Sequence, residues 1–460
     1  MEKFGIRAVV SNGLCVGCGA CAVVVPDIKM TRDQYGVMQA IVPKELDNKT
    51  LNLASAVCPF SSASLNEDEH AEYLWEKFAL SDDKIGSYLA LHAGRVNDQS
   101  YLLNSSSGGL TSWVCIQLMK KGLIDGVIHV GPTSDAVQGL YEFQVSRSID
   151  ELRLRRKSQY YSVSANDVLC SIKGDGKRYA FVGVPCFIKA LRNIERHEPA
   201  VKAQIVFALG LVCGHMKSSA FAELMAWQVG VRPEQLASVD FRVKDETKPA
   251  SRYAFAASAV GAQPRLKTSS KLIGGNWGHA AMQLNACNYC DDIFAELADV
   301  TFGDAWIPQY ESVWQGTNIV VSRNVLISEI LEEARNSGEI ALDDLTPALM
   351  IESQNGNFRH RREGLAQRLA DDDLACVQRP AKRVVADGTI LTEHRREIVR
   401  LRRAMGHASH DLFLKAKAAG SIRSYIRGIA RFSSRMDELT KPPLLGRAVG
   451  KLMRLLGFSS

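Results

Sequence analysis

The sequence predicts an α/β protein with two additions, a cysteine-rich unit at its start and a basic helical segment at its end. Three observations support this prediction. From about residue 100, apolar strands alternate with amphipathic helices. Four of the 11 cysteines fall in the first 60 residues, and residues 391–460 carry 15 Lys and Arg against 5 Asp and Glu. We therefore expect a small N-terminal domain, a larger α/β body and a basic helical C-terminal tail.

The α/β body is predicted from periodicity. Helices are expected at residues 66–77, 107–122, 185–195 and 326–338, where apolar side chains recur every three or four positions. Short apolar runs predict strands at 126–131, 177–183, 203–215, 238–244, 299–306 and 318–323. Strands that alternate with helices favour a sheet covered by helices.

The bulk composition is that of a soluble globular protein, with 46% hydrophobic and 23% charged residues in a chain of 460. The opening stretch MEKFGIRAVVSNG shows no secretory signal, and the first 390 residues contain no apolar run long enough to span a bilayer. We expect a cytoplasmic protein whose cysteines are not paired in disulfides.

The first cysteine group lies in CVGCGAC, where Cys15, Cys18 and Cys21 have the C-x2-C-x2-C spacing of a 4Fe-4S site. In a bacterial ferredoxin a fourth cysteine follows four residues later, but Val25 stands there, before Pro26. A remote Cys58, also followed by proline, supplies the fourth ligand in our interpretation. The alternative is zinc, which normally uses two C-x2-C pairs or Cys and His pairs. The spacing therefore predicts one cluster in a ferredoxin-type domain.

A second group of cysteines stands at strand ends and helix starts. Cys186 opens a predicted helix, Cys213 ends a buried strand, and Cys287 and Cys290 form a C-x2-C pair. Such positions favour a thiolate or place chemistry at the edge of a sheet, yet Cys186 and Cys213 taken singly are more typical of core cysteines. The C-x2-C pair indicates metal binding or redox work. The other three, Cys115, Cys170 and Cys376, are predicted to be buried thiols.

A serine and glycine loop precedes the helix at 107–122. Its residues are Ser105, Ser106, Ser107, Gly108 and Gly109. Hydroxyls and free N–H groups at a helix start suit a phosphate or pyrophosphate, although an ordinary serine cap explains the same residues. The sequence has neither GxGxxG after a strand nor GxxxxGK[ST], which disfavours a Rossmann nicotinamide site and a P-loop.

Taken in order, these segments resemble the coenzyme F-420 hydrogenase/dehydrogenase beta-subunit family, which includes 7-hydroxymethyl chlorophyll a reductase-like proteins. The resemblance runs from about residue 10 to about residue 330. It rests on CVGCGAC with a distant Cys-Pro, SSSGGLTSWVCIQLMKKGLIDGVI, KSQYY, FVGVPCFIKALR, GLVCGH and CNYCDDIFAELADVTFGDAW.

The resemblance implies an iron–sulfur flavoprotein. It implies that the loop Ser105–Gly109 holds the phosphates of FAD, that Lys157, Ser158 and Gln159 lie beside the flavin, and that the second cysteine group binds a second 4Fe-4S cluster. His215, next to Cys213, is either a proton donor near the flavin or, as is commoner, a structural histidine. The implied domains are a ferredoxin-type 4Fe-4S domain at 1–68, a flavin domain with the second cluster at 96–330, an α/β extension at 331–390 and the tail at 391–460.

The leading hypothesis is an oxidoreductase that moves electrons between a one-electron carrier such as ferredoxin and a two-electron organic substrate, through 4Fe-4S clusters and FAD. One alternative is an electron-transfer subunit of a larger redox complex, without a substrate of its own. Another is a non-catalytic zinc or iron–sulfur structural protein. The partners expected are a redox protein and a small-molecule substrate, and an oligomer is compatible with the sequence.

The tail has a net charge of +10, against −4 for the rest of the chain. Its basic and apolar residues separate onto two helical faces: Arg423, Arg427, Arg431 and Arg435 against Tyr425, Ile426, Ile429 and Phe432, then Arg447, Lys451 and Arg454 against Leu452, Leu455 and Leu456. Such helices suit either peripheral contact with an anionic membrane or packing on the protein's own acidic body. No nucleic-acid motif accompanies the charge, so no nucleic-acid partner is expected.

Overall fold

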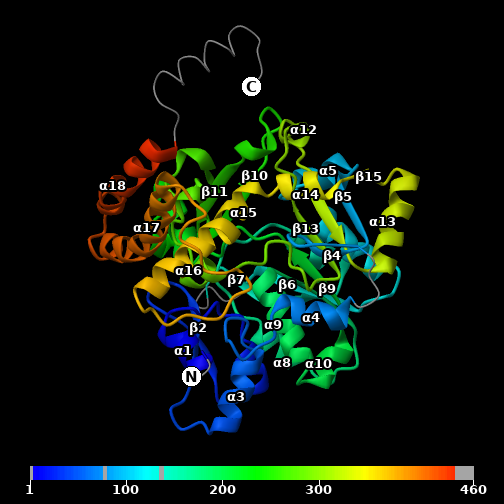
Figure 1. Cartoon of the computed structure of the whole chain (residues 1–460). Coiled ribbons are helices and arrows are strands. Elements are labelled where there is room, and N and C mark those ends of the chain that lie inside the picture. The colour runs from blue at the N-terminus through cyan, green and yellow to red at the C-terminus, as the bar shows by residue number, and fades with distance from the viewer. Residues whose placement is uncertain (1–3, 76–79, 134–138, 441–460) are drawn as a thin grey trace.

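A mixed eight-stranded sheet forms the centre of the computed structural model, which describes residues 4–75, 80–133 and 139–440 (Figure 1). The strand order is β15-β5-β14-β13-β9-β8-β6-β7. The strands are β5 (Ala90–Val96), β6 (Gly126–Pro132), β7 (Tyr141–Ser146), β8 (Tyr179–Gly183), β9 (Ile205–Leu211), β13 (Val300–Asp304), β14 (Asn318–Ser322) and β15 (Ile340–Asp344). The strands that the sequence predicted at 126–131, 177–183, 203–215, 299–306 and 318–323 all lie in this sheet.

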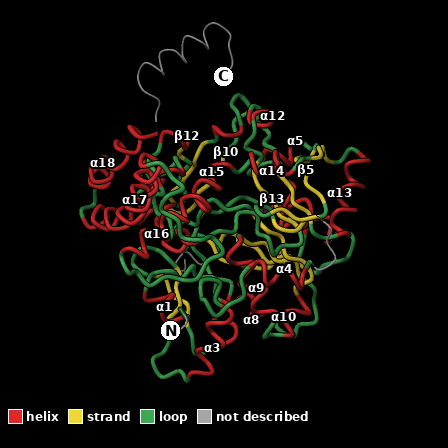
Figure 2. The backbone as a smooth tube through the Cα atoms, in the orientation of Figure 1, coloured by secondary structure: helices red, strands yellow, loops and turns green. Residues whose placement is uncertain are grey.

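The four inner strands β13, β9, β8 and β6 run parallel, whereas the strands outside them pair antiparallel. Alternate residues of β8 face opposite hydrophobic clusters: Ala180 faces one, and Tyr179 and Phe181 face the other. Helices α6 (Leu110–Lys120) and α13 (Val325–Ser337) pack in the first cluster, and α9 (Pro185–Glu195) in the second. The α/β class is therefore confirmed, and Figure 2 shows helices around the central strands.

The N-terminal unit is small and shares its core with the body. It comprises α1 (Ile6–Ser11), α2 (Ala20–Val24), the hairpin β1 (Lys29–Arg32) and β2 (Met38–Ile41), and α3 (Asn48–Val57). Helix α4 (Glu67–Leu74) then leads to the short pair β3 (Leu80–Asp82) and β4 (Gly86–Tyr88). The apolar side chains of the N-terminal unit belong to the same hydrophobic cluster as those of α8 (Asn166–Ile172) and α9. The unit therefore lies directly against the body (Figure 1).

A second, three-stranded antiparallel sheet stands beside the main one. It is formed by β10 (Leu236–Val243), β11 (Ala254–Ala259) and β12 (Arg265–Thr268), with α11 (Ala220–Gln228) packed on it. The strand predicted at 238–244 is thus present, but in this smaller sheet. The remaining helices before the C-terminal pair are α5 (Gln99–Leu103), α7 (Ile149–Leu154), α10 (Pro199–Gln204), α12 (Pro308–Glu311), α14 (Pro347–Glu352), α15 (Asn355–Phe358), the π-helix η6 (Arg359–Glu363) and α16 (Gly364–Leu374).

The basic C-terminal segment packs on the body. Helices α17 (Glu393–Ala418) and α18 (Ile422–Thr440) lie together beside the smaller sheet (Figure 1). Tyr425 and Ile429 are fully buried in one cluster with Phe413 and with residues of that sheet. Half of the apolar face that suited a membrane is thus buried against the protein itself, while Ile426 is exposed and Phe432 is partly buried. Residues 441–460, which carry the second basic segment, lie outside the described residues.

Two of the isolated cysteines correct the sequence analysis. Cys115 is buried as expected, but Cys170 and Cys376 are exposed. Cys170 lies on the outer side of the short helix α8, and Cys376 follows the end of α16, where burial cannot be read from a single cysteine. None of the described helices is long and apolar enough to cross a membrane.

Candidate active site

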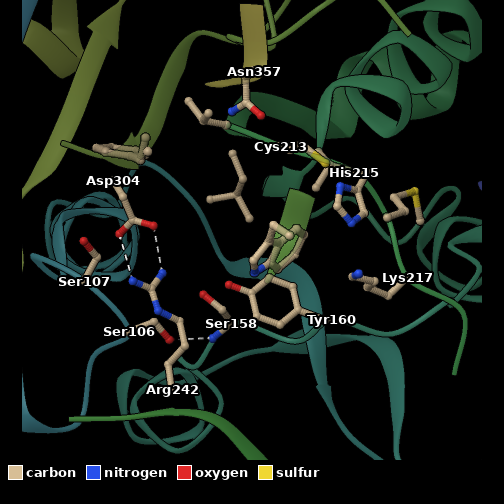
Figure 3. Close-up of a pocket in the computed structure, with 18 of the residues that line it drawn as sticks. Ser106, Ser107, Ser158, Tyr160, Cys213, His215, Lys217, Arg242, Asp304 and Asn357 are labelled. Atoms are coloured by element: carbon tan, nitrogen blue, oxygen red, sulfur yellow. Dashed lines mark hydrogen bonds and ion pairs between the residues drawn. The ribbon is translucent and has the colours of Figure 1, made fainter. Parts of the chain in front are cut away.

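A large cavity opens at the carboxyl ends of the parallel strands. Its volume is about 1090 Å³, and residues at the ends of β8, β9 and β13, namely Gly183, Leu211 and Asp304, contribute to its wall. Ligands of open α/β sheets bind at this edge, because the strand ends and the loops that follow them converge there. The cavity is therefore the candidate active site, and Figure 3 shows part of its lining.

The first cysteine group comes together in the N-terminal unit. Cys15 and Cys18 lie in the loop before α2, Cys21 lies in α2, and Cys58 caps the end of α3. Burial, with the neighbouring thiols Cys15, Cys18 and Cys58, raises the pKa of Cys21 well above its ordinary value. Thiols crowded in this way hold their protons unless a cation is present, which is the condition that a metal site requires.

The glycines between these cysteines have a structural role. Gly17 and Gly19 both have positive φ, of 74° and 84°. A Cβ on Gly17 would lie 2.5 Å from Cβ of Met38, and one on Gly19 would lie 2.5 Å from Oγ of Ser164. The loop therefore turns tightly while packed against β2 on one side and against the body on the other.

The second cysteine group is assembled from distant parts of the chain. Cys186 lies in the first turn of α9, Cys213 follows β9, and Cys287 and Cys290 lie in and after the short helix η5 (Asn285–Tyr289). Met216 joins two of them: its Sδ lies 3.6 Å from Sγ of Cys186, and its backbone N–H donates to Sγ of Cys287 at 3.2 Å. Burial raises the pKa of Cys287 to about 12, with Cys213 the next cause.

The sulfur spacing disfavours a single zinc ion in either group. A tetrahedral zinc site with Zn–S bonds of about 2.3 Å places its sulfurs about 3.8 Å apart. Within the described part of the chain, no three cysteine sulfurs lie mutually within 4.8 Å. A multi-iron cluster separates its thiolates more widely, since each sulfur binds a different iron. The donor sets therefore fit clusters better than zinc.

The two groups are neighbours in space. After burial and the three other thiols of its own group, the charge of Cys18 is the next cause that raises the pKa of Cys186. A buried ion network ties the units together close by: Arg383 donates to Asp68 and Glu296 at 2.8 Å each and lies 3.5 Å from Glu67. The fold thus brings a site from the first 60 residues beside one built from residues 186–290.

Arg361 connects the second group to the π-helix. Its guanidinium donates to Sγ of Cys290 at 3.0 Å and to the carbonyl of Gly214 at 3.1 Å, and its side chain is almost fully buried. The charges of Cys290, Cys213 and Cys287 raise the pKa of Arg361 although burial opposes them. π-Turns are often found at functional sites, and this one aims a charged side chain at a candidate ligand.

The serine and glycine loop forms one end of the cavity, and its residues have different structural roles. Ser105, Ser106, Ser107 and Gly109 line the cavity (Figure 3 labels Ser106 and Ser107). Ser105 is buried and donates to the carbonyl of Tyr101 at 2.8 Å, and Gly108 does not line the cavity. A Cβ on Gly108 would lie 2.7 Å from the carbonyl oxygen of Gly94, so this glycine is required for packing against the sheet.

Lys157, Ser158 and Gln159 all line the same cavity. The ammonium of Lys157 is already paired with Asp240 at 3.0 Å, and the backbone N–H of Ser158 donates to Oγ of Ser106 at 2.8 Å. The amide oxygen of Gln159 is buried without a hydrogen-bond partner. Of the three, Gln159 is therefore the side chain that has capacity for a ligand.

Two basic residues of β10 and its end were missed by the sequence analysis. Arg242 forms a two-fold ion pair with Asp304 at 2.8 and 3.1 Å across the cavity wall (Figure 3). Lys244 donates to the carbonyls of Leu102 and Ser107 at 2.7 and 2.8 Å and so braces the serine loop. Both belong to the expected strand at 238–244, but only the tertiary contacts show that Arg242 lines the cavity and that Lys244 supports the loop beside it.

The opposite end of the cavity carries Cys213, His215 and Lys217 (Figure 3). His215 is buried, its Nδ1 lies 3.4 Å from the Arg402 guanidinium, and its ring lies 4.5 Å from that of Trp277. Lys217 is buried with its ammonium over Trp277 and Phe221. Burial and the charge of Arg402 lower the pKa of Lys217 well below its usual value. Aromatic and polar groups thus meet beside a candidate cluster ligand.

The unpartnered polar atoms indicate that the cavity takes a polar ligand. Five lining residues have a buried side-chain atom without a hydrogen-bond partner: Gln159 Oε1, His215 Nε2, Arg242 Nε, His360 Nε2 and Arg402 Nε. Buried polar groups are almost always hydrogen-bonded in folded proteins. A large cavity with a hydroxyl-rich helix start and several idle donors fits a flavin nucleotide, which carries both a pyrophosphate and a polar ring system.

The fold and the site define a class of protein: a mixed α/β chain with two neighbouring groups of four cysteines, one of which reaches a large cavity through Cys213. The comparisons with known proteins agree with this class. The model of the coenzyme F420 hydrogenase/dehydrogenase beta subunit N-terminus matches residues 91–170, and the model of its C-terminus matches residues 176–348. The chain belongs to this family of redox proteins.

Curated relatives are redox proteins of methanogens. The chain is 25% identical to a coenzyme F420-dependent sulfite reductase of Methanocaldococcus jannaschii over 46% of its own length and 32% of that protein. It is 23% identical to one component of the F(420)H(2) dehydrogenase of Methanosarcina mazei, over 78% and 94% of the two chains. It is 22% identical to the beta subunit of the coenzyme F420 hydrogenase of Methanosarcina barkeri, over 56% and 83%. The matched segment thus spans a third of the sulfite reductase but most of each of the other two relatives.

Proposed function

We propose that this chain is a flavin-dependent iron–sulfur oxidoreductase that transfers electrons between a one-electron carrier, such as a ferredoxin, and a two-electron organic substrate. The observation that carries the proposal is the assembly of the second cysteine group. Four thiols from three separate segments meet beside the first group, and one of them, Cys213, also lines the cavity. Membership of a redox family supports it.

Each site has residues suited to its cofactor. The first group, Cys15, Cys18, Cys21 and Cys58, would hold one 4Fe-4S cluster, and the second, Cys186, Cys213, Cys287 and Cys290, another; the serine loop and Gln159 would hold FAD. When bound, the clusters exchange single electrons, and the flavin exchanges two electrons as hydride with an organic molecule.

The chain's own residues provide orientation and exclude water. Lys244 and the Arg242–Asp304 pair hold the serine loop and the cavity wall in place. Tyr160 and Trp277 line the cavity and pack edge to face, and Phe241 packs edge to face on Tyr160 outside the lining, so that aromatic surface covers this part of the cavity. Arg361 places a positive charge beside Sγ of Cys290 in the second group. That charge would favour the reduced, more negative state of a cluster bound there.

The decisive experiment is chemical analysis of protein purified without oxygen. We expect a brown protein with about eight irons and eight sulfides per chain and one FAD, with absorbance from both cofactor types. Zinc in place of iron, or a colourless protein, would remove the proposal. Four irons with FAD would leave the first group and contradict the second.

A second candidate function is supported by the relatives, several of which are named as subunits. In that case the chain would pass electrons within a larger redox complex and have no organic substrate of its own. Affinity purification from the native source, followed by a turnover assay with and without the co-purified partner, separates the two. Activity of the chain alone favours the first candidate, and strict dependence on a partner favours the second.

A further inference from the structure

The two ends of the cavity differ in how their positive charges are balanced. We define the serine end by Arg155, Arg156, Lys157, Arg242 and the loop Ser105–Gly109. We define the arginine end by Arg359, Arg395, Arg402, His215 and His360. All of these residues except Gly108 line the cavity.

At the serine end the cations have partners. Lys157 pairs with Asp240 at 3.0 Å, and Arg242 pairs with Asp304 at 2.8 Å. Arg155 lies 3.7 Å from Glu151. Arg156 stacks over Tyr101 at 4.0 Å and donates to a backbone carbonyl. These charges are therefore largely committed to the protein.

At the arginine end, no carboxylate of the described residues pairs with the three arginines. Across the described residues, Arg359, Arg395 and Arg402 form no ion pair; Arg402 has a single side-chain contact, to His215. The one acidic residue at this end of the lining is Glu352, which is exposed and unpaired in the same part of the chain. Burial and the nearby charge of Arg361 lower the pKa of Arg402 to about 10, as expected where positive charge lacks an anion.

The two histidines add donors to this end. Arg402 donates to Nδ1 of His215 and Arg368 donates to Nδ1 of His360, at 3.4 and 3.3 Å. Each ring therefore carries its proton on Nε2. Both Nε2 atoms are buried and have no acceptor. Three guanidinium groups without an ion pair, of which that of Arg359 is exposed, and two N–H groups without an acceptor thus line one cavity, and all of them are donors.

We propose that the arginine end binds a carboxylate or phosphate group of the organic substrate, so that the substrate is an anion. Planar guanidinium groups recognise these oxyanions through paired, charge-assisted hydrogen bonds. The three arginines come from η6 and α17, beyond the segments that match the family models. The inference rests on the proposed function and specifies its substrate class.

The cavity geometry suits this division. Cys213 and His215 lie across the cavity from Ser106, Ser107 and Arg242 (Figure 3). The pyrophosphate of a flavin nucleotide would occupy the serine end, which leaves the arginine end for a second anion. An oxyanion there would be held beside Cys213, where electrons would arrive from the second cysteine group.

The test uses the full chain purified without oxygen with its cofactors. Inorganic phosphate and acetate serve as separate probes of the two oxyanions, and binding is followed by calorimetry and by the flavin absorbance. The variants are Arg395→Gln and Arg402→Gln. The matched control is Arg400→Gln, on the same helix but outside the cavity and paired with Asp371 at 2.7 Å.

At least one probe should bind the unaltered protein without displacing iron or flavin. Each cavity variant should weaken that binding by about tenfold or more, and the control should not. Iron and flavin contents should be unchanged. Arg395 is half-buried in the first turn of α17, so its variant remains informative if Arg402→Gln folds poorly.

Three results would overturn the inference. The unaltered protein binds neither probe; the cavity variants lose flavin, which would assign these arginines to the cofactor; or they change the iron signals while probe affinity stays the same, which would make them counter-charges of a cluster. If the unaltered protein holds no flavin, the proposed function fails, while calorimetry with the same probes still decides the anion site.

Discussion

The two cysteine groups reach similar compositions by different routes. The first takes three thiols from seven consecutive residues and a fourth from Cys58, at the end of a nearby helix. The second takes its thiols from three segments over a hundred residues of chain and meets only where β8, β9 and β13 lie side by side. One site is built by a local turn, and the other is built by the sheet.

Their surroundings differ as well. Around Cys15, burial raises the pKa of the thiol and backbone hydrogen bonds from Gly17 and Ala40 lower it. The second group has a buried guanidinium on Cys290 and a cavity at Cys213. Under the proposed function, the second cysteine group would exchange electrons with the ligand in the cavity, because Cys213 lies at the cavity wall. The first group would exchange them with the external electron carrier.

The largest expected effect separates the two groups directly. Cys58→Ser and Cys290→Ser should each reduce the iron content from about eight to about four per chain, because each removes one ligand of a different four-thiol site. EPR spectra of the two variants should show complementary signals. Cys170→Ser, at an exposed cysteine outside both groups, is the control. Full iron in Cys58→Ser would mean that the remote cysteine is not a ligand.

The next largest effect is expected from a substitution at the ion network between the two cysteine groups. Arg383→Met removes the cation shared by Glu67, Asp68 and Glu296 and should lower the free energy of unfolding by about 3 kcal/mol, because the buried Glu67 and Glu296 keep only their pairs with Lys189 and Arg362. Chemical unfolding measures this change. Arg379→Met, whose partner Asp373 is exposed, should change it by less than about 1 kcal/mol.

This junction also has a pH signature. Burial alone would raise the pKa of Glu67, but the charges of Lys189 and Arg383 hold it below its usual value. A lowered pKa contributes stability above the ordinary carboxyl range, which is lost as the pH falls through that range. In Arg383→Met, Glu67 takes up a proton more readily, so the loss of unfolding free energy relative to the unaltered protein should become smaller as the pH falls toward the ordinary carboxyl range. A loss independent of pH would contradict the role of these charges.

A smaller effect is expected on the reduction potential of the second group. Arg361→Gln removes the positive charge from Cys290 and should lower that potential by about 60 mV, equivalent to about 1.4 kcal/mol for one electron. The potential of the first group should stay the same. Arg362→Gln is the matched control in a redox titration followed by EPR, because Arg362 belongs to the same π-helix, lies outside the cavity lining and pairs with Glu296. Equal shifts at both groups would refute the assignment of Arg361 to one site.

The smallest effect concerns the flavin. Gln159→Leu removes an amide whose buried oxygen has no partner in the protein and should weaken FAD binding by about fivefold, near 1 kcal/mol. Gln117→Leu, whose amide binds Glu339 away from the cavity, should not. Flavin released during ultrafiltration measures the affinity. Unchanged retention in Gln159→Leu would place the ligand elsewhere in the cavity.

Local patterns were the reliable part of the sequence analysis. Five of the predicted strands lie in the main sheet and one in the smaller sheet, and the helix starting at Pro185 is present. The antiparallel partners β5, β7 and β15 were not predicted, because their short runs mix polar and apolar residues. Burial of Cys170 and Cys376 was wrong, since a lone cysteine carries no information about its neighbours.

The division has a physical cause. CVGCGAC, the serine and glycine loop and the helix starts are contained in a few consecutive residues, where backbone geometry and spacing limit what can form. Arg242, Arg361 and Arg402 carry no such local signal, and their contacts with Asp304, Cys290 and His215 join residues 62 to 187 positions apart. The order of strands in the sheet and the packing of α17 on the body decided which side chains share the cavity. These contacts form only in the folded tertiary structure, because no single segment contains both partners of any of them.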